Sequence, residues 1–292
     1  MLSVVTLVRN RNRMLRDFLR GWSSQDLEEL EVVVVRAGGY EDPTEATVDG
    51  PTPTVRHVTL PTGLDSEAIA YSHARNAGAA AARGDRLVFC DADTMPAPGC
   101  ARRLHDALGD HDALITGDVR YLPPDVDLSR PVESLVALAR PNPGRPTPPA
   151  APGEVDLTWR HELVWGLCMG LRTTTFRDLG GFDESFCGYA GEDTDLATAV
   201  RSSGRPAGAV GGAVVLHQHH DSFEPPLHQL RATVANAQRY RDKWGAWPME
   251  GWLTRFASAG LVEWRNDVVE VLRDPTPDEV EAHRCRVAAP FR

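Results

Sequence analysis

The chain has 292 residues, enough for one large α/β domain or two small ones. Its apolar content of 42% is that of a globular protein, and its formal net charge of −10 argues against a nucleic-acid partner. No apolar run is long enough to span a bilayer, and residues 1–8 lack the basic start of a signal peptide, so we expect a cytoplasmic protein.

Strand and helix signals alternate over the first part of the chain. Residues 3–8 predict an apolar strand, and the apolar side chains that follow recur at helical spacing as far as Trp22. The β-branched run 31–35 is typical of a buried parallel strand, and a weaker run at 55–60 predicts a third strand. The Ala-rich residues 66–83 predict a second helix.

The alternation then continues with a strand at 87–90, a helix at 97–108 and a strand at 113–116. Strands that are joined through helices pair in parallel and bury both faces of their sheet. The sequence therefore predicts an α/β fold, with a mostly parallel central sheet flanked by helices.

The second half begins with a segment that regular structure cannot contain. Residues 141–153 hold six prolines and two glycines, which indicates a mobile loop that serves as a lid or hinge. Further on we predict a helix at 193–201, a strand at 213–216 and an amphipathic helix at 226–244. The region from this helix onward is rich in tryptophan and contains Trp244, Trp247, Trp252 and Trp264.

These patterns predict a main domain at 1–221, with halves 1–120 and 121–221, followed by an extension. Residues 222–292 are expected to form a helical extension. The five cysteines include no Cys-x-x-Cys pair, so we expect free thiols, and the excess of Arg over Lys suggests a GC-rich bacterial genome.

The first functional signal is the acidic triplet Asp91-Ala92-Asp93, directly after the strand at 87–90. Alternate side chains of an extended segment point the same way, so both carboxylates are expected to project from the carboxyl end of a strand, where parallel sheets bind ligands. Two carboxylates there suit Mg²⁺ or Mn²⁺. Because three other Asp-x-Asp triplets occur, the position after a strand, rather than the tripeptide, favours this site.

The predicted helix before this triplet carries Arg75 and Asn76. An Arg on an Ala-rich helix is usually a solvated surface charge. Beside a diphosphate it would instead neutralise phosphate oxygens, while Asn76 would hydrogen-bond the nucleotide. The neighbouring Asp pair favours the second interpretation.

The second functional signal is Gly191-Glu192-Asp193, at the start of the helix predicted at 193–201. A structural role is the alternative, since acids in a first helical turn complement the helix dipole. That role accounts for one of the two acidic residues but not for both. The preceding residues 186–190 are mostly small, which lets a sugar approach the backbone. Before them lies Trp165, which either stacks on a sugar ring or packs in the core.

A histidine-rich stretch, His217-Gln218-His219-His220-Asp221, follows the strand at 213–216. A lone histidine is more often structural than a metal ligand. A zinc cluster of these histidines is not expected, because no acidic or Cys partner has suitable spacing.

The order of these signals resembles the nucleotide-diphospho-sugar transferases of the GT-A fold. The closest similarity is to family 2 glycosyltransferases and to the C-terminal part of the β-1,4-galactosyltransferase and chondroitin-polymerase type. It implies that residues 1–120 bind the nucleotide and that residues 121–221 supply the acceptor side. The resemblance covers roughly residues 1–245 and rests on Ala74-Arg75-Asn76-Ala77-Gly78, Asp91-Ala92-Asp93, Gly180-Gly181-Phe182-Asp183-Glu184 and Gly191-Glu192-Asp193. It implies an inverting, metal-dependent transfer of a sugar from a nucleotide-diphosphate sugar to an acceptor hydroxyl of a glycan or small molecule.

The resemblance also implies roles for single residues. Asp193 would be the general base and Glu192 would orient a sugar. His217 would join Asp91 and Asp93 as the third protein ligand of the cation, and an imidazole favours Mn²⁺ over Mg²⁺. The nucleotide sugar would be bound by Arg9, Arg75, Asn76, Asp91, Ala92, Asp93 and Trp165.

Two departures from the family pattern concern the donor. The family often has Gly-Gly-Asn where this chain has Gly166-Leu167-Cys168. Related enzymes commonly end their second strand with an acidic pair that reads the base, whereas here Val35 runs into Arg36-Ala37-Gly38-Gly39. A UDP-sugar is the expected donor, but the end of the second strand lacks the acidic pair that would support uridine as the base.

Three other functions are compatible with parts of the pattern. A sugar-nucleotide pyrophosphorylase would need a Gly-rich phosphate loop after the first strand, where this chain has Arg9-Asn10-Arg11-Asn12-Arg13. A dinucleotide dehydrogenase would need Gly-x-Gly-x-x-Gly there. An inactive partner subunit that only binds nucleotide sugars would not need both acidic clusters.

Overall fold

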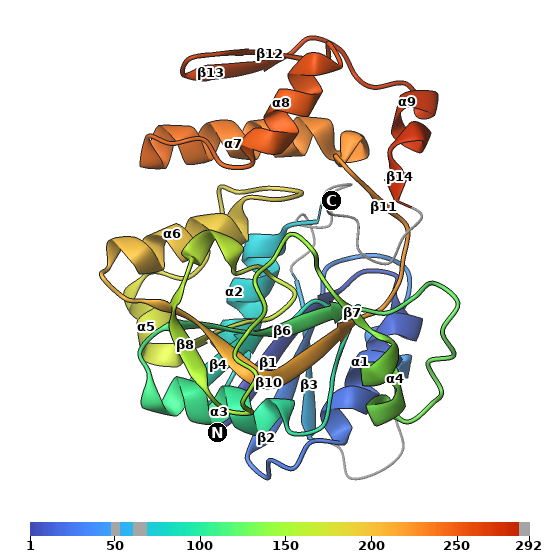
Figure 1. Ribbon diagram of the computed structural model, residues 1–292, viewed down its shortest axis with the longest axis vertical. Coiled ribbons are helices and arrows are strands. Elements are labelled where there is room, and N and C mark those ends of the chain that lie inside the picture. Colours follow the sequence, from blue (N-terminus) through green and yellow to red (C-terminus); the bar gives the residue numbers. More distant parts are fainter. Residues whose placement is uncertain (48–52, 61–68, 286–292) are drawn as a thin grey trace.

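The computed structural model of the protein describes residues 1–47, 53–60 and 69–285. Within these ranges one sheet of ten strands forms the centre of the molecule (Figure 1). Its strands are β1 (Leu2–Val8), β2 (Leu30–Arg36), β3 (Thr54–Thr59), β4 (Arg86–Phe89), β5 (Thr94–Pro96), β6 (Leu114–Tyr121), β7 (Arg140–Pro141), β8 (Val155–Trp159), β9 (Met169–Arg172) and β10 (Ala207–His217).

The longer strands of this sheet pair in parallel. The strand order is β3-β2-β1-β4-β9-β6-β10-β5, with β7 paired to β6 and β8 to β10. Pairing is parallel from β3 through β4 and again between β6 and β10, whereas the short strands β5, β7, β8 and β9 pair antiparallel. The predicted α/β fold with a mostly parallel central sheet is therefore confirmed.

Helices cover both faces of the sheet, as its buried β-branched strands require. One face packs against α1 (Asn12–Ser23) and α3 (Cys100–Asp110), with Phe18 and Leu104 in a common core. The other packs against α2 (Tyr71–Ala81), α5 (Thr173–Asp178) and α6 (Glu192–Ser202). A smaller cluster includes α4 (Val132–Leu138), and short 3-10 turns lie at Pro43–Glu45 and His161–Leu163.

Several elements differ in extent from the sequence prediction. The helix predicted at 66–83 begins at Tyr71, and residues 66–68 lie outside the described part of the chain. The strand predicted at 213–216 begins earlier, at Ala207. The prediction was too short because Gly208, Gly211 and Gly212 have the appearance of a turn in the sequence. Gly211 allows a close approach instead, since a Cβ there would lie 2.2 Å from the carbonyl oxygen of Ala151.

The Pro-rich segment 141–153 is irregular beyond Pro141, as predicted, but it is anchored at both ends. Pro141 pairs with Arg120 of β6. At the other end, Gly153 donates to the carbonyl of Gly211 at 2.8 Å, and Gly211 donates to that of Glu154 at 2.8 Å. The segment therefore forms a wall beside β6 and β10 that is held at both ends, and its role as a lid or hinge stays a prediction.

The C-terminal extension has a hydrophobic core of its own and lies above the sheet domain in Figure 1. Its helices are η3 (Leu227–Gln229), α7 (Leu230–Trp244), α8 (Glu250–Ser258) and α9 (Pro277–Ala282). Two strand pairs were not predicted: the hairpin β12 (Val262–Arg265) with β13 (Val268–Val271), and β11 (Ser222–Phe223) with β14 (Arg284–Cys285). Trp264 of the hairpin packs on Trp247 with ring centroids 5.6 Å apart, so tertiary contacts stabilise these strands.

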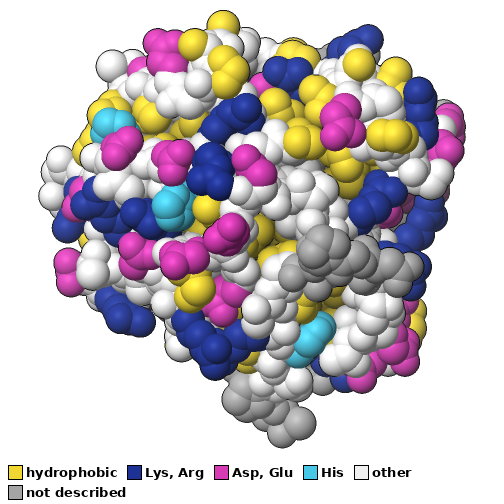
Figure 2. All heavy atoms as spheres, turned by 90° about the horizontal axis from the view of Figure 1, so that it is seen from below, with side chains coloured by type: hydrophobic (Ala, Val, Ile, Leu, Met, Phe, Trp, Pro, Cys, Tyr) yellow, Lys and Arg dark blue, Asp and Glu magenta, His cyan; other side chains and the backbone are white. Residues whose placement is uncertain are grey.

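The outer surface of the described molecule is of mixed charge where Figure 2 shows it. On this face, seen from below, acidic and basic side chains are interspersed. Among the helices that the structure describes, none combines the length and apolar composition needed to cross a membrane.

Candidate active site

The first acidic triplet lies in a turn rather than on an extended strand. β4 ends at Phe89, and the amide of Thr94 donates to the carbonyl of Asp91 at 3.0 Å, which closes the turn around the buried Ala92. The premise that residues 91–93 are extended is therefore wrong, and strand alternation does not apply to them. That Asp91 and Asp93 share one cation stays a prediction. The two carboxylates reach different partners.

Asp93 forms one cluster with two histidines. Its side chain is 9% exposed and lies 3.8 Å from Nε2 of His217, at the end of β10, and 3.2 Å from Nε2 of His220. One ligand atom from each residue can be chosen so that all three lie within 4.8 Å of one another. A third neighbour, Arg11, donates to Asp93 Oδ2 at 2.9 Å.

This cluster has the chemistry of a divalent-cation site. Oδ1 of Asp93 is buried and has no hydrogen-bond partner among the described residues, so it has lone pairs available for a metal ion. Burial lowers the pKa of His217 to about 4, which keeps its imidazole neutral and able to coordinate. A carboxylate with two imidazoles suits Mn²⁺ better than Mg²⁺.

The structure brings His217 and Asp93 together as expected, adds His220 and leaves Asp91 out. His220 follows His217 by three residues, and the chain turns after β10 so that both reach the same carboxylate. The amide of Gln218 donates to the carbonyl of Asp93 at 2.7 Å and fixes this turn. The His-x-x-His spacing was the available sequence signal for His220.

Arg75 connects the two acidic clusters. It lies on α2 and is 4% exposed, which rules out a solvated surface charge. It donates to Glu192 at 2.6 Å and to Asp91 at 3.1 Å, and its guanidinium lies 5.4 Å from the ring centroid of Phe182. Gly166 is needed beside it, because a Cβ there would lie 2.3 Å from Arg75 Nη2.

Replacing Arg75 with Ala is expected to destabilise the fold. The variant leaves Glu192 and Asp91 without their cation, and removing one partner of a buried ion pair costs about 3–5 kcal/mol. Chemical denaturation monitored by tryptophan fluorescence measures the loss. Arg231→Ala is the matched control, since its ion pair with Asp274 is exposed and should matter little. Equal midpoints for the two variants would contradict the prediction.

Glu192 and Asp193 begin α6 but differ in environment. Gly191 precedes them with φ of 100°, a left-handed conformation that suits glycine. Glu192 is buried against Arg75, and burial with the charge of Asp193 raises its pKa to about 7 although Arg75 opposes this. Asp193 is half-buried, and its Oδ2 accepts from the amide of Gly166 at 3.3 Å. Of the two carboxylates, Asp193 is the more accessible to a substrate.

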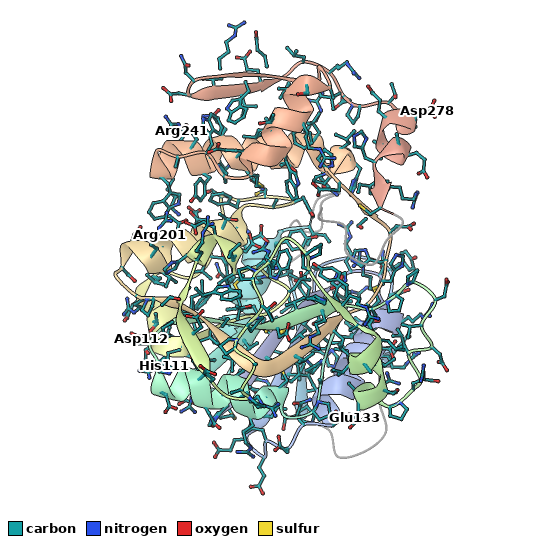
Figure 3. The ribbon with its side chains drawn as sticks, in the orientation of Figure 1. His111, Asp112, Glu133, Arg201, Arg241 and Asp278 are labelled. Carbon is teal, nitrogen blue, oxygen red and sulfur yellow. The ribbon has the colours of Figure 1, made fainter. Side chains whose placement is uncertain are left out.

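The C-terminal extension holds the loop that precedes Glu192. Asn236 of α7 is fully buried and donates at 2.7–3.2 Å to the carbonyls of Cys187, Tyr189 and Ala190. Lys243 and Trp244, near the end of α7, bind Asp195 of α6 at 2.9 and 2.7 Å. Figure 3 labels Arg201 on α6 and Arg241 on α7, on the same side of the molecule. The extension therefore helps to position the second acidic cluster.

Asn236→Ala is expected to lower kcat/KM about 10–100-fold, because a displaced active-site loop misplaces the reacting groups. Gln238→Ala is the control on the same helix. Gln238 hydrogen-bonds Asp242, the carbonyl of Asp267 and the amide of Val269, and none of these belongs to the active-site loop. Both variants should melt earlier, but only Asn236→Ala should lose turnover in steady-state kinetics. An equal loss in both would mean that Asn236 acts through stability alone.

The remaining predicted residues lie around these clusters. Asn76 is engaged by the protein, because its side chain donates to the carbonyl of Phe182 and accepts from the same residue's amide, both at 2.9 Å. These bonds shape the Gly-Gly-Phe-Asp-Glu loop, while a bond from Asn76 to the nucleotide stays a prediction. Trp165 is half-buried with the guanidinium of Arg145 over its ring. Arg9 follows β1, beside Gly39.

An open pocket adjoins the metal-ligand cluster. It lies where β1 ends and is lined by the side chains that follow this strand, together with Glu41, His220 and Asp221. The lining after β1 consists of Asn10, Arg11, Asn12, Arg13 and Met14. Its position at the carboxyl end of a parallel strand is where open α/β sheets bind ligands.

A parallel sheet with a carboxylate–histidine cluster at one edge and an acid pair on the next helix defines the GT-A class of sugar transferases. Residues 3–179 match the profile of glycosyl transferase family 2, which is more than half of the chain. The protein belongs to this family. No curated protein matches the sequence.

Solved structures with this fold are distant in sequence. S. aureus TarS 1-349 aligns with a TM-score of 0.56 at 14% identity over 82% of this chain and 65% of its own, so the present chain spans less than two thirds of it. GalNAc-T7, solved with UDP, GalNAc and Mn²⁺, aligns with a TM-score of 0.56 at 14% identity, over 88% of this chain and 56% of its own. The mannosyltransferase PcManGT from Pyrobaculum calidifontis, solved with GDP-Man and Mn²⁺, aligns with a TM-score of 0.53 at 17% identity, over 89% of this chain and 75% of its own.

Proposed function

We propose that the protein transfers a sugar from a nucleotide-diphosphate sugar to an acceptor hydroxyl, with inversion and with a divalent cation. The Asp93–His217–His220 cluster carries this proposal, since its buried Oδ1 atom and two imidazoles form a ligand set for Mn²⁺. When bound, the cation would neutralise charge on the departing nucleoside diphosphate. TarS has been solved with UDP, and two structural neighbours were solved with Mn²⁺ and a nucleotide or nucleotide sugar, which supports the same ligands here.

The protein's own side chains divide the remaining work. Arg11, beside Asp93 and in the pocket after β1, would bind the diphosphate of a nucleotide placed there. Arg75 fixes Asp91 and Glu192, so we assign both carboxylates to shaping the site around the transferred sugar. Asp193 would accept the proton of the acceptor hydroxyl, for which its exposure suits it better than Glu192.

Inversion follows from a single displacement. The acceptor oxygen would attack the anomeric carbon from the face opposite the nucleoside diphosphate, with Asp193 as base and no covalent intermediate on the protein. Residues 1–120 would supply Asp93 and most of the pocket for the nucleotide, while His217, His220 and Asp221 come from the second half. Residues 121–221, with the extension from 222 onward, would form the acceptor side. Family membership argues against a pyrophosphorylase.

A thermal-shift experiment tests this function. UDP, GDP, dTDP and CDP are each added with and without Mn²⁺, and a ligand at a hundred times its Kd adds about 2.7 kcal/mol, a shift of a few degrees at this size. One nucleotide should stabilise the protein only with Mn²⁺ and thereby identify the donor class. No shift with any nucleotide would contradict the proposal. Binding without turnover of the matching nucleotide sugars would instead indicate the inactive-subunit alternative.

A further inference from the structure

A second pocket lies next to Trp165, and the reaction proposed above does not use its other side chains. It is bounded on one side by β6 and on the other by the Pro-rich segment after β7. Its polar lining comes chiefly from Asp118, Asn142 and Arg145, and its aromatic lining from Trp159 and Trp165. Because the Pro-rich segment is anchored to β6 and β10, this wall is preformed.

Arg145 is the chemically distinctive group of this pocket. Its guanidinium lies 3.6 Å from the ring centroid of Trp165, a stacking distance that holds the planar head in one orientation. Its Nη1 atom is buried and has no hydrogen-bond partner among the residues that the structure describes. Arg145 lies over the ring of Trp165, and the amide of the next residue, Gly166, donates to Asp193 Oδ2 at 3.3 Å, so Arg145 and Asp193 flank one short segment. Burial lowers the pKa of Arg145, and the charge of Asp193 opposes this shift. An arginine remains charged in such a site.

The carboxylate and the amide that line the pocket are already engaged, whereas Nε1 of Trp159 is a second buried donor without a partner among the described residues. Asp118 accepts two hydrogen bonds from Arg120, at 2.6 and 2.8 Å, so its charge is paired outside the pocket. The side-chain oxygen of Asn142 accepts from the amide of Gly144 at 2.8 Å. In the described part of the chain, Arg145 therefore forms no ion pair while it presents a buried donor to the pocket. A buried unpaired donor is costly, and an anionic ligand is its natural complement.

We propose that Arg145 binds an anionic group of the acceptor, a carboxylate or a phosphate, in this pocket. The pocket volume of about 30 Å³ limits it to that small group, so the rest of the acceptor would lie outside the pocket, toward Asp193. The inference rests on the proposed function, in which Asp193 takes the proton of the acceptor hydroxyl. The proximity of Arg145 to Asp193 allows one acceptor to place its anion on the guanidinium and its hydroxyl at the base. The nucleotide occupies the other pocket, which is lined by the residues after β1.

Calorimetric titration of the full chain tests the inference with three sugars that differ in charge: glucose, glucuronate and glucose 6-phosphate. Each is added with and without saturating UDP and Mn²⁺. We expect at least one anionic sugar to bind about tenfold or more tightly than glucose, since a charge-assisted hydrogen bond contributes about 1.5–3 kcal/mol. The stronger of the two anionic sugars identifies carboxylate or phosphate. Equal binding of all three sugars would overturn the proposal.

Two variants locate the effect. Arg145→Gln should bind the preferred anionic sugar at least tenfold more weakly and leave glucose unchanged, whereas the exposed Arg130→Gln should behave as wild type. Unchanged anion binding by Arg145→Gln overturns the assignment. If that variant does not fold, Arg145→Lys replaces it. Lysine lacks the planar fork, so its affinity for the anion should fall severalfold, and a wild-type affinity would count against the site.

The nucleotide titrations separate this inference from the proposed function. Arg145→Gln should bind UDP and Mn²⁺ as wild type does. A loss of nucleotide binding in that variant would assign Arg145 to the donor and overturn the acceptor subsite. If wild type binds no nucleotide, the proposed function fails, and the titrations without UDP still decide whether the pocket binds anions.

Discussion

Asp193→Asn is expected to lower kcat by about 10²–10⁴-fold, the contribution of a positioned general base. The substitution preserves the shape of the side chain and an oxygen that can accept from the amide of Gly166. It removes only the capacity to accept the proton of the acceptor hydroxyl. Binding of the nucleotide with Mn²⁺ should therefore remain within a few-fold of wild type, while turnover is lost.

The neighbouring acid provides the contrast. Glu192→Gln removes the negative partner of the buried Arg75, which donates to it at 2.6 Å, so this variant should mainly lose stability. Melting curves and single-turnover rates on both variants distinguish the two roles. If Glu192→Gln loses turnover and Asp193→Asn retains it, the base is Glu192, and the assignment based on exposure is wrong.

The parts of the fold that local sequence determines were predictable. β1 and β2 are β-branched or apolar runs whose residues are almost all buried, so the short continuous runs identify them without alternation. The hairpin of β12 and β13 was not predictable, because its Trp264 is stabilised by Trp247, which comes earlier in the chain. β10 was underestimated because its glycines allow backbone contacts that a sequence does not reveal.

For the site, the sequence identified residue types better than their partners. The two acidic clusters and His217 were recognised by their order along the chain. The turn at 91–93 separates Asp91 from Asp93, and the turn after β10 brings in His220; both depend on backbone geometry after a strand ends. The contacts of Asn236 with the loop before Glu192 join residues far apart in sequence. Such long-range contacts leave no local pattern to read.

Asp93→Ala is expected to abolish Mn²⁺-dependent nucleotide binding and to lower turnover by about 10³-fold or more, since a catalytic metal supplies several kcal/mol of transition-state stabilisation. Asp93 is the only acidic member of the Asp93–His217–His220 cluster, and its removal also leaves Arg11 without this carboxylate. Thermal shifts with and without Mn²⁺, together with initial rates, measure both effects on one sample.

Two matched variants separate metal binding from charge. Asp125→Ala removes an exposed carboxylate from another Asp-x-Asp triplet and should leave the Mn²⁺ response unchanged. Asp91→Ala removes the partner of Arg75 but no member of the Asp93–His217–His220 cluster, so it should destabilise the fold while a Mn²⁺-dependent shift remains. Because sequence alone placed both Asp91 and Asp93 on the cation, the Asp91→Ala result decides between the two arrangements. Loss of the Mn²⁺ response in Asp91→Ala at wild-type stability would restore the paired-carboxylate site.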